Sequence, residues 1–337
     1  GSSKPRQRGR RRGGAVRPMG GCFGRPHHKA WKYGEAKPEV PKVDERAGDF
    51  HRSGDDRLWL FSRRWEPSEP HKAWATLMIL HGPTDHSGAY AQLGERLCAR
   101  GVAVFASDMR GWGRSDGEAL HFHDIEAFAR DVLADYRRIH GASSPYGDVR
   151  SRFLLGQSIG ALMAAWVTSS NPQLWGGFIG ASGAFVMHRQ QQLSKRKVKA
   201  LRFLLSVAPK LRLARPFDHA LIVSDAAARR EWEEDALASH GRATVAYFAE
   251  LLRTTEALPE RLKALHVPAL LLWGTNDRVV SEEGHKLVLQ ASRDSRSRLL
   301  RYPGGFHNLL AEPAIRANLV ADIEEWMANI ANVQQPG

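Results

Sequence analysis

The sequence predicts an α/β protein with a mostly parallel sheet that is covered by helices on both faces. From residue 57 onward, short apolar segments typical of buried strands alternate with longer segments of helical periodicity. Glycines and polar residues follow directly after several of these strands, where parallel sheets place their sites. Hydrophobic residues make up 42% of the 337 residues and charged residues 25%, which excludes a disordered, collagen-like or disulfide-stapled chain.

The first half of the alternation contains five predicted strands and three predicted helices. We expect strands at 57–65, 74–80, 102–107 and 152–155, and helices at 90–100, 125–140 and 161–169. A further strand at 175–180 closes this half. In the second half we expect strands at 269–273 and 298–302, a helix at 282–292 and a closing helix at 314–330. No repeat of 20–50 residues is visible, which excludes a solenoid or a propeller.

Residues 184–265 interrupt this order with mainly helical segments, which we interpret as a lid over the site. Its first part, residues 189–215, contains nine Lys and Arg and no acid. Val198, Leu201, Leu205 and Ala208 recur there at helical spacing between the cations. Such a helix suits a lipid headgroup layer, and it equally suits packing on the body with a solvated basic face. The two interpretations are compatible.

The positive charge is concentrated in residues 1–43. This segment contributes +10 to the net charge of +13. The remaining 294 residues, which form the domain at 44–337, therefore carry nearly equal numbers of positive and negative charges. It is rich in Gly, Arg and Pro and has no periodicity, which predicts a disordered tail. Nucleic acid is therefore not expected as a partner of the domain, and association through the tail stays an alternative.

The tail also contains Met19-Gly20-Gly21-Cys22 followed by basic residues. If translation began at Met19, Gly20 could be myristoylated and Cys22 palmitoylated, although Gly24 stands where the pattern usually has Ser or Thr. The alternative is a solvated flexible arm. Two cysteines fit a reducing compartment, and no apolar run is long enough to span a bilayer. We expect a cytoplasmic protein, with a peripheral membrane surface as a partner.

Gly156-Gln157-Ser158-Ile159-Gly160 lies between a predicted strand and a predicted helix. A sharp turn there needs both glycines, because a side chain at either would clash, and it projects the serine hydroxyl above the sheet. A serine hydroxyl needs a base, and the base needs a carboxylate to orient it. Asp277 and His307 each follow a later predicted strand, and the order Ser158, Asp277, His307 is the one that this type of sheet uses.

Five ordered segments together resemble the α/β-hydrolases of the monoacylglycerol lipase and lysophospholipase type, from about Asp44 to the C-terminus. They are the His81-to-Ser87 segment, the Asp108-to-Gly117 segment, the serine turn, and the segments around Asp277 and His307. The resemblance implies an α/β-hydrolase fold and a serine ester hydrolase that cleaves acyl esters of glycerol or lysophospholipids through an acyl-enzyme. It implies no metal and no cofactor. His240, His266 and His285 are interpreted as surface groups.

One residue departs from the family pattern. The resemblance implies an oxyanion hole made by the N–H of Ile159 and by the N–H of the residue after His81-Gly82, which is Pro83 and has none. Either Thr84 substitutes for it, or the hole has one donor and the enzyme is slow. A catalytically weak lipid-binding or scaffold protein, and an acyltransferase that uses the same triad, are therefore kept as alternatives. The sequence leaves the oligomeric state open.

Overall fold

The structure is a computed structural model that describes Gly1, residues 48–55 and residues 57–334, with side chains to residue 332. The predicted tail and its Met19–Cys22 motif lie outside the described residues.

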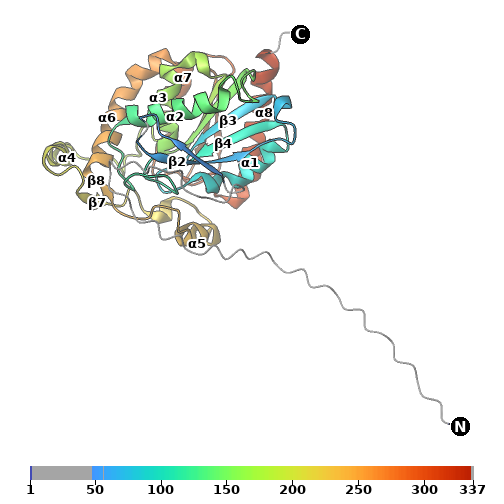
Figure 1. Ribbon diagram of the computed structural model, residues 1–337. Helices are drawn as coiled ribbons and strands as arrows, with labels where there is room; N and C mark the ends of the chain where they lie inside the picture. The colour runs from blue at the N-terminus through green and yellow to red at the C-terminus, as the bar shows by residue number, and fades with distance from the viewer. Residues whose placement is uncertain (2–47, 56, 335–337) are drawn as a thin grey trace. The chain divides into compact units, whose positions relative to one another are not determined.

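An eight-stranded sheet forms the centre of the described domain, in the order β1-β2-β4-β3-β5-β6-β9-β10 (Figure 1). β1 and β2 pair antiparallel with their neighbours, and the other six strands run parallel. The strands are β1 (Asp49–Arg52), β2 (Trp59–Trp65), β3 (Ala75–Leu80), β4 (Val102–Ser107), β5 (Ser151–Gln157), β6 (Gly177–Ala181), β9 (Ala269–Gly274) and β10 (Arg298–Tyr302). The predicted class is confirmed, and β1 is an edge strand that the sequence analysis missed.

Helices cover both faces of the sheet because the central strands are apolar on both sides. Along β3, Leu77 and Ile79 point into one core, whereas Met78 and Leu80 point into the other. The first core contains α1 (Ala91–Cys98) and α8 (Pro313–Gln334), and the second contains α2 (Ile125–His140), α3 (Ile159–Ser170) and α7 (Glu282–Ser292). The predicted bounds of α2, α7, β4 and β10 match the observed ones.

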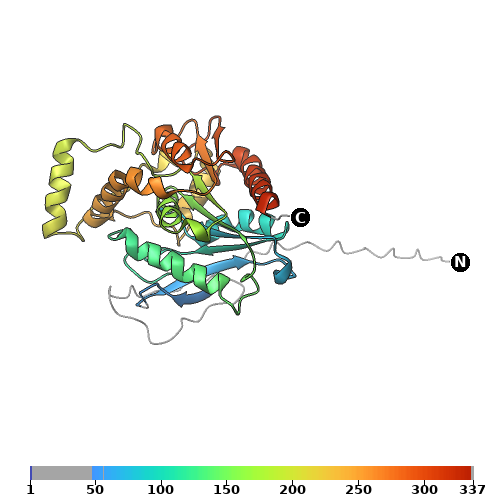
Figure 2. The same cartoon turned by 90° about the horizontal axis from the view of Figure 1, so that it is seen from above.

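The segment between β6 and β9 adds three helices, of which α4 lies farthest out from the sheet, beside α6 (Figure 2). It contains α4 (Lys195–Val207), α5 (Ala226–Glu234) and α6 (Val245–Arg261), with a two-stranded sheet of β7 (Arg212–Ala214) and β8 (Ala243–Thr244). α4 packs Leu201 and Leu204 against α6 through Val245 and Ala249. The predicted helical insertion is therefore present, and the small sheet in it was not expected.

Within the described residues, no helix combines the length and the apolar character that crossing a bilayer requires.

Candidate functional site

Ser158 lies at the turn between β5 and α3, at the carboxyl end of a central strand. Its φ of 55° and ψ of −117° lie outside the regions that L-residues favour, so neighbouring packing must hold the turn in place. A Cβ at residue 156 would lie 2.2 Å from the Gly160 carbonyl oxygen, and one at residue 160 would lie 2.2 Å from the Leu80 carbonyl oxygen. The predicted steric reason for both glycines is confirmed.

Asp277 follows β9 in a tight turn, in which its N–H donates to the Gly274 carbonyl. Its Oδ1 accepts hydrogen bonds from the N–H groups of Val279 at 2.8 Å and Val280 at 3.0 Å. Its Oδ2 lies 2.8 Å from Nδ1 of His307. The carboxylate is thus held on one oxygen by backbone donors and presents the other to the imidazole.

Nε2 of His307 lies 2.9 Å from Oγ of Ser158. Because Nδ1 faces a carboxylate, that nitrogen carries the proton in the neutral ring and Nε2 is free to accept from the hydroxyl. Ser158, Asp277 and His307 are all less than 5% exposed. The structure therefore brings the three predicted residues into one buried chain of hydrogen bonds, which is the geometry that nucleophilic catalysis by serine requires.

Ile159 and Thr84 are the two predicted oxyanion donors. Ile159 is the first residue of α3, where a backbone N–H has no acceptor inside the helix. In the part of the chain that the structure describes, the N–H groups of Ile159 and Thr84 donate to no protein acceptor. Pro83 and Ile159 line the same small cavity as Ser158.

Trp112 and His81 hold the segment that carries Thr84. Nε1 of Trp112 donates to the Pro83 carbonyl at 2.5 Å, and the ring is 1% exposed. The Pro83–Thr84 peptide is trans, so its carbonyl and the Thr84 N–H point in opposite directions. The Trp112 bond thereby sets the direction of the Thr84 N–H. The sequence analysis missed Trp112, although it lies in the segment that carried the resemblance.

His81 supports the same loop from its start. Its Nε2 accepts from the Met109 N–H at 2.9 Å, so Nδ1 carries the proton and donates to the Gly82 carbonyl at 2.7 Å. Burial lowers the pKa of His81 to about 4, which keeps the ring neutral near neutral pH. This neutral form is the one that both hydrogen bonds require.

The cavity beside Ser158 is apolar and small, with a volume of about 20 Å³. Besides Pro83 and Ile159, its lining comes from Val279, Val280 and the 184–265 insertion. The residues from the insertion are Ala184, Met187, Pro216, Phe217, Tyr247 and Leu251. Such a volume holds about one water molecule.

The insertion also contacts the loops of the site directly. The Ser239 N–H donates to the Thr84 carbonyl at 3.3 Å, and Nε2 of His86 lies 2.8 Å from Oδ2 of Asp235. The Asn308 N–H, next to His307, donates to the Ile222 carbonyl at 2.8 Å. The insertion is therefore in contact with both the Thr84 and the His307 loops.

A polar groove of about 510 Å³ is lined in part by residues that neighbour the His307 loop in sequence. It contains Asp85 and Asn308, whose Nδ2 donates to Oδ2 of Asp85 at 3.2 Å. Burial raises the pKa of Asp85 to about 6, against the opposing attraction of nearby His86. The groove thus contains hydrogen-bonding groups, in contrast to the apolar cavity at Ser158.

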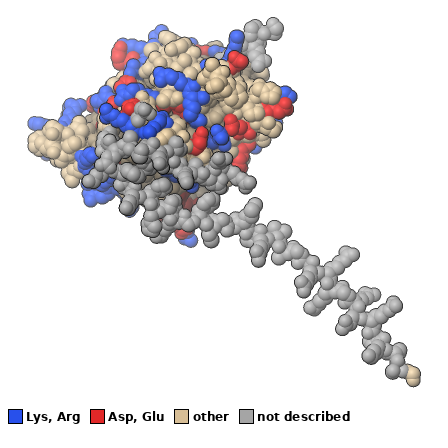
Figure 3. Space-filling model, viewed as in Figure 1, with Lys and Arg blue, Asp and Glu red and all other residues tan. Residues whose placement is uncertain are grey.

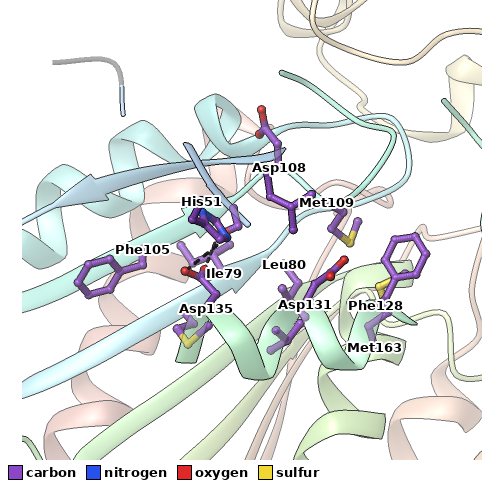
Figure 4. Close-up of a pocket in the computed structure, with 14 residues that line it drawn as sticks. His51, Ile79, Leu80, Phe105, Asp108, Met109, Phe128, Asp131, Asp135 and Met163 are labelled. Atoms are coloured by element: carbon purple, nitrogen blue, oxygen red, sulfur yellow. Dashed lines mark hydrogen bonds and ion pairs between the residues drawn. The ribbon is translucent and has the colours of Figure 1, made fainter. Parts of the chain in front are cut away.

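A second enclosed cavity, of about 30 Å³, lies under β3 and β4 against α2 (Figure 4). Its acidic side chains have partners: Arg110 donates twice to Asp131 at 2.7 Å, and Oγ of Ser107 donates to Asp135 at 2.5 Å. The space holds about one water molecule. It is therefore part of the structural core and no ester fits there.

The histidines set aside as surface groups differ in their surroundings. His266 is exposed, as expected, and His240 is half-buried. His285 is 0% exposed, so its assignment as a surface group is wrong. The helical spacing around His285 did not show which face of α7 the sheet would cover. Among the described residues, no three His, Cys, Asp or Glu side chains form a cluster that could hold a metal ion.

The fold and the turn at Ser158 define the class of the protein. Six parallel strands with helices on both faces, and a serine at a strained strand–helix turn after β5, are the architecture of the α/β-hydrolases. The chain is a serine hydrolase with the α/β-hydrolase fold.

Comparisons with known proteins identify the family. The model of the family described as serine aminopeptidase, S33 matches residues 71–314, and the chain belongs to this family. Over 280 residues it is 29% identical to the monoglyceride lipase of Mus musculus, covering 83% of this chain and 90% of that protein.

Two solved structures share the fold. The monoacylglycerol lipase of Paleococcus ferrophilus superimposes with a TM-score of 0.71 at 22% identity, covering 80% of this chain and 99% of that one. A soluble variant of the monoglyceride lipase of Saccharomyces cerevisiae gives 0.72 at 16% identity, covering 88% and 97%. The predicted α/β-hydrolase resemblance is confirmed.

Proposed function

We propose that the chain hydrolyses monoacylglycerol-type esters, with Ser158 as nucleophile, His307 as base and Asp277 as the residue that orients it. The observation that carries this proposal is the buried chain of hydrogen bonds at 2.9 Å and 2.8 Å. The relatives named monoglyceride lipases support the substrate class.

In the proposed reaction, Oγ of Ser158 attacks the ester carbonyl while Nε2 of His307 takes its proton. Asp277 stabilises the imidazolium that forms, and the N–H groups of Ile159 and Thr84 stabilise the oxyanion. His307 then protonates the leaving glycerol oxygen. Water hydrolyses the acyl-enzyme by the same steps, with His307 again as base.

The apolar pocket beside Ser158 takes the acyl chain in this proposal. Because the apolar pocket is nearly closed, we propose that residues 184–265 act as a lid that opens for the acyl chain.

Labelling by a fluorophosphonate probe tests the proposal, with wild type compared against Ser158→Ala. Labelling and monoacylglycerol turnover in wild type alone support it. Equal turnover in Ser158→Ala refutes it. A folded wild type that binds monoacylglycerol without labelling or turnover favours the lipid-binding alternative. Products formed with added alcohols, compared with water alone, distinguish an acyltransferase.

We also propose that α4 docks on a lipid surface. Phe203, Val207 and Leu211 are 66%, 61% and 49% exposed and lie among the cations of residues 195–215. The part of the molecule that contains α4 projects as an apolar surface flanked by Lys and Arg (Figure 3). Apolar side chains among cations match the headgroup region of an anionic membrane.

Sedimentation with phosphatidylserine-containing vesicles tests this docking. The double variant Phe203→Ser, Val207→Ser should lose vesicle binding and keep its turnover of a soluble short-chain ester, which serves as the control for folding. Unchanged vesicle binding by the double variant contradicts the proposal.

A further inference from the structure

His285 is a fully buried histidine that takes no part in the proposed proton transfer. It lies in the first turn of α7, shortly after the loop of Asp277. Its Nε2 accepts a hydrogen bond from the N–H of Gly183 at 3.0 Å. Nδ1 therefore carries the proton of the neutral ring and donates to the Ser281 carbonyl at 3.1 Å. Both nitrogens are used, and the tautomer is determined.

His285 contacts the loop of residues 181–184, and this loop holds the backbone of Ser158. The Ser158 N–H donates to the Ala181 carbonyl at 3.0 Å, and the Ser158 carbonyl accepts from the Ala184 N–H at 3.0 Å. Residues 181–184 thus hold the nucleophile's backbone on both sides. Since Ser158 itself has a strained conformation, its geometry depends on this clamp.

Each backbone N–H from Ser182 to Ala184 has an acceptor, and only one of the three acceptors is a side chain. The Ser182 N–H donates to the Leu272 carbonyl of β9 at 2.8 Å, and the Ala184 N–H donates to Ser158. The Gly183 N–H, between them, donates to His285. Ser182 also has a positive φ of 45°, so the loop is itself strained and needs external support.

The other nitrogen of His285 connects this clamp to the loop of the catalytic acid. The Ser281 carbonyl that it contacts follows Val280, whose N–H donates to Asp277. Burial lowers the pKa of His285 to about 4, so Nε2 keeps its lone pair for Gly183 near neutral pH. A protonated ring would present an N–H to the Gly183 N–H and lose the bond.

We propose that His285 is a positioning residue, which acts through the 181–184 loop to hold Ser158 in register with the Asp277 loop. This inference rests on the proposed role of Ser158 as nucleophile. His285 touches no reacting atom. It joins two loops that approach each other only in the folded chain, in addition to the backbone hydrogen bonds of Ser281 with Val186 and of His188 with Val279.

The test compares kcat and KM of four variants for a soluble short-chain ester, together with their Tm. His285→Gln keeps an acceptor near the Nε2 position, whereas His285→Leu removes it and His285→Asn is too short to reach Gly183. Val288→Ala, one turn along α7 and equally buried, is the control for loss of stability without loss of this contact.

We expect His285→Leu and His285→Asn to lower kcat by about tenfold or more with little change in KM, because the nucleophile is misplaced while binding is kept. His285→Gln should restore most of kcat. Val288→Ala should lower Tm and leave kcat unchanged. If His285→Leu does not fold, the comparison of kcat between His285→Asn and His285→Gln decides the test.

Two results would overturn the inference: full kcat in His285→Asn or His285→Leu, or a His285→Gln variant as slow as His285→Asn. Ser158→Ala is measured in parallel. If Ser158→Ala keeps full turnover, the proposed function itself fails. If it is inactive while the His285 variants keep wild-type kcat, only the positioning role is refuted.

Discussion

Replacement of Gly160 by alanine should push the start of α3, and Ser158 with it, away from the end of β3. A Cβ at this position would lie 2.2 Å from the Leu80 carbonyl oxygen and 2.5 Å from that of His81. Both contacts are with backbone at the end of β3, which cannot rotate away. The start of α3 must therefore move from β3 by about 1 Å, and Ser158 and the Ile159 N–H move with it.

The contact distances set the expected magnitudes. Forcing a methyl group into a closely packed site costs about 1–3 kcal/mol of the free energy of unfolding. For a domain of this size each kcal/mol corresponds to about 2–4 °C, so Tm should fall by several degrees. A displacement of about 1 Å at the reacting groups lowers kcat by up to about 10²-fold.

Differential scanning fluorimetry gives Tm, and hydrolysis of a soluble short-chain ester gives kcat. Gly241→Ala is the matched control, because residue 241 is exposed and the nearest neighbour of its Cβ would be Leu120 Cδ1 at 3.8 Å. It should behave as wild type. A Gly160→Ala protein with the Tm and kcat of wild type would refute the steric reasoning.

Three further changes have defined outcomes. Asp277→Asn should lower kcat by about 10⁴-fold with little effect on Tm, because the amide favours the wrong tautomer of His307. An activity near that of wild type in single-turnover kinetics would contradict this. Trp112→Phe removes the donor to the Pro83 carbonyl and should lower kcat with KM unchanged; a normal kcat would show that the bond does not orient Thr84. Burial lowers the pKa of His140 to about 4 from 6.5, so between these values only the unfolded chain binds the proton and stability falls as pH falls. His140→Gln should reduce the slope of the free energy of unfolding against pH by up to about 1.4 kcal/mol per pH unit, as measured by urea titrations. An unchanged slope would show that His140 does not cause this pH dependence.

Local patterns were sufficient to predict most elements. The bounds of β4, α2, α7 and β10 match because each has a clear apolar period and an adjacent capping or turn residue. Asp124 and Ser281, for example, cap α2 and α7 with side-chain oxygens. β1 was missed because a four-residue edge strand has too little periodicity to stand out.

The order of Ser158, Asp277 and His307 and the steric need for Gly156 and Gly160 follow from the sequence itself, because a strand–turn–helix pattern is a local property of the chain. The direction of the Pro83–Thr84 peptide and the burial of His285 do not. Each depends on contacts between residues far apart in sequence: Trp112 with Pro83, and His285 with Gly183. Only packing of the helices and loops against the sheet decides which donor meets which acceptor, so the tertiary structure alone determines what holds Ser158 and the Pro83–Thr84 peptide in place.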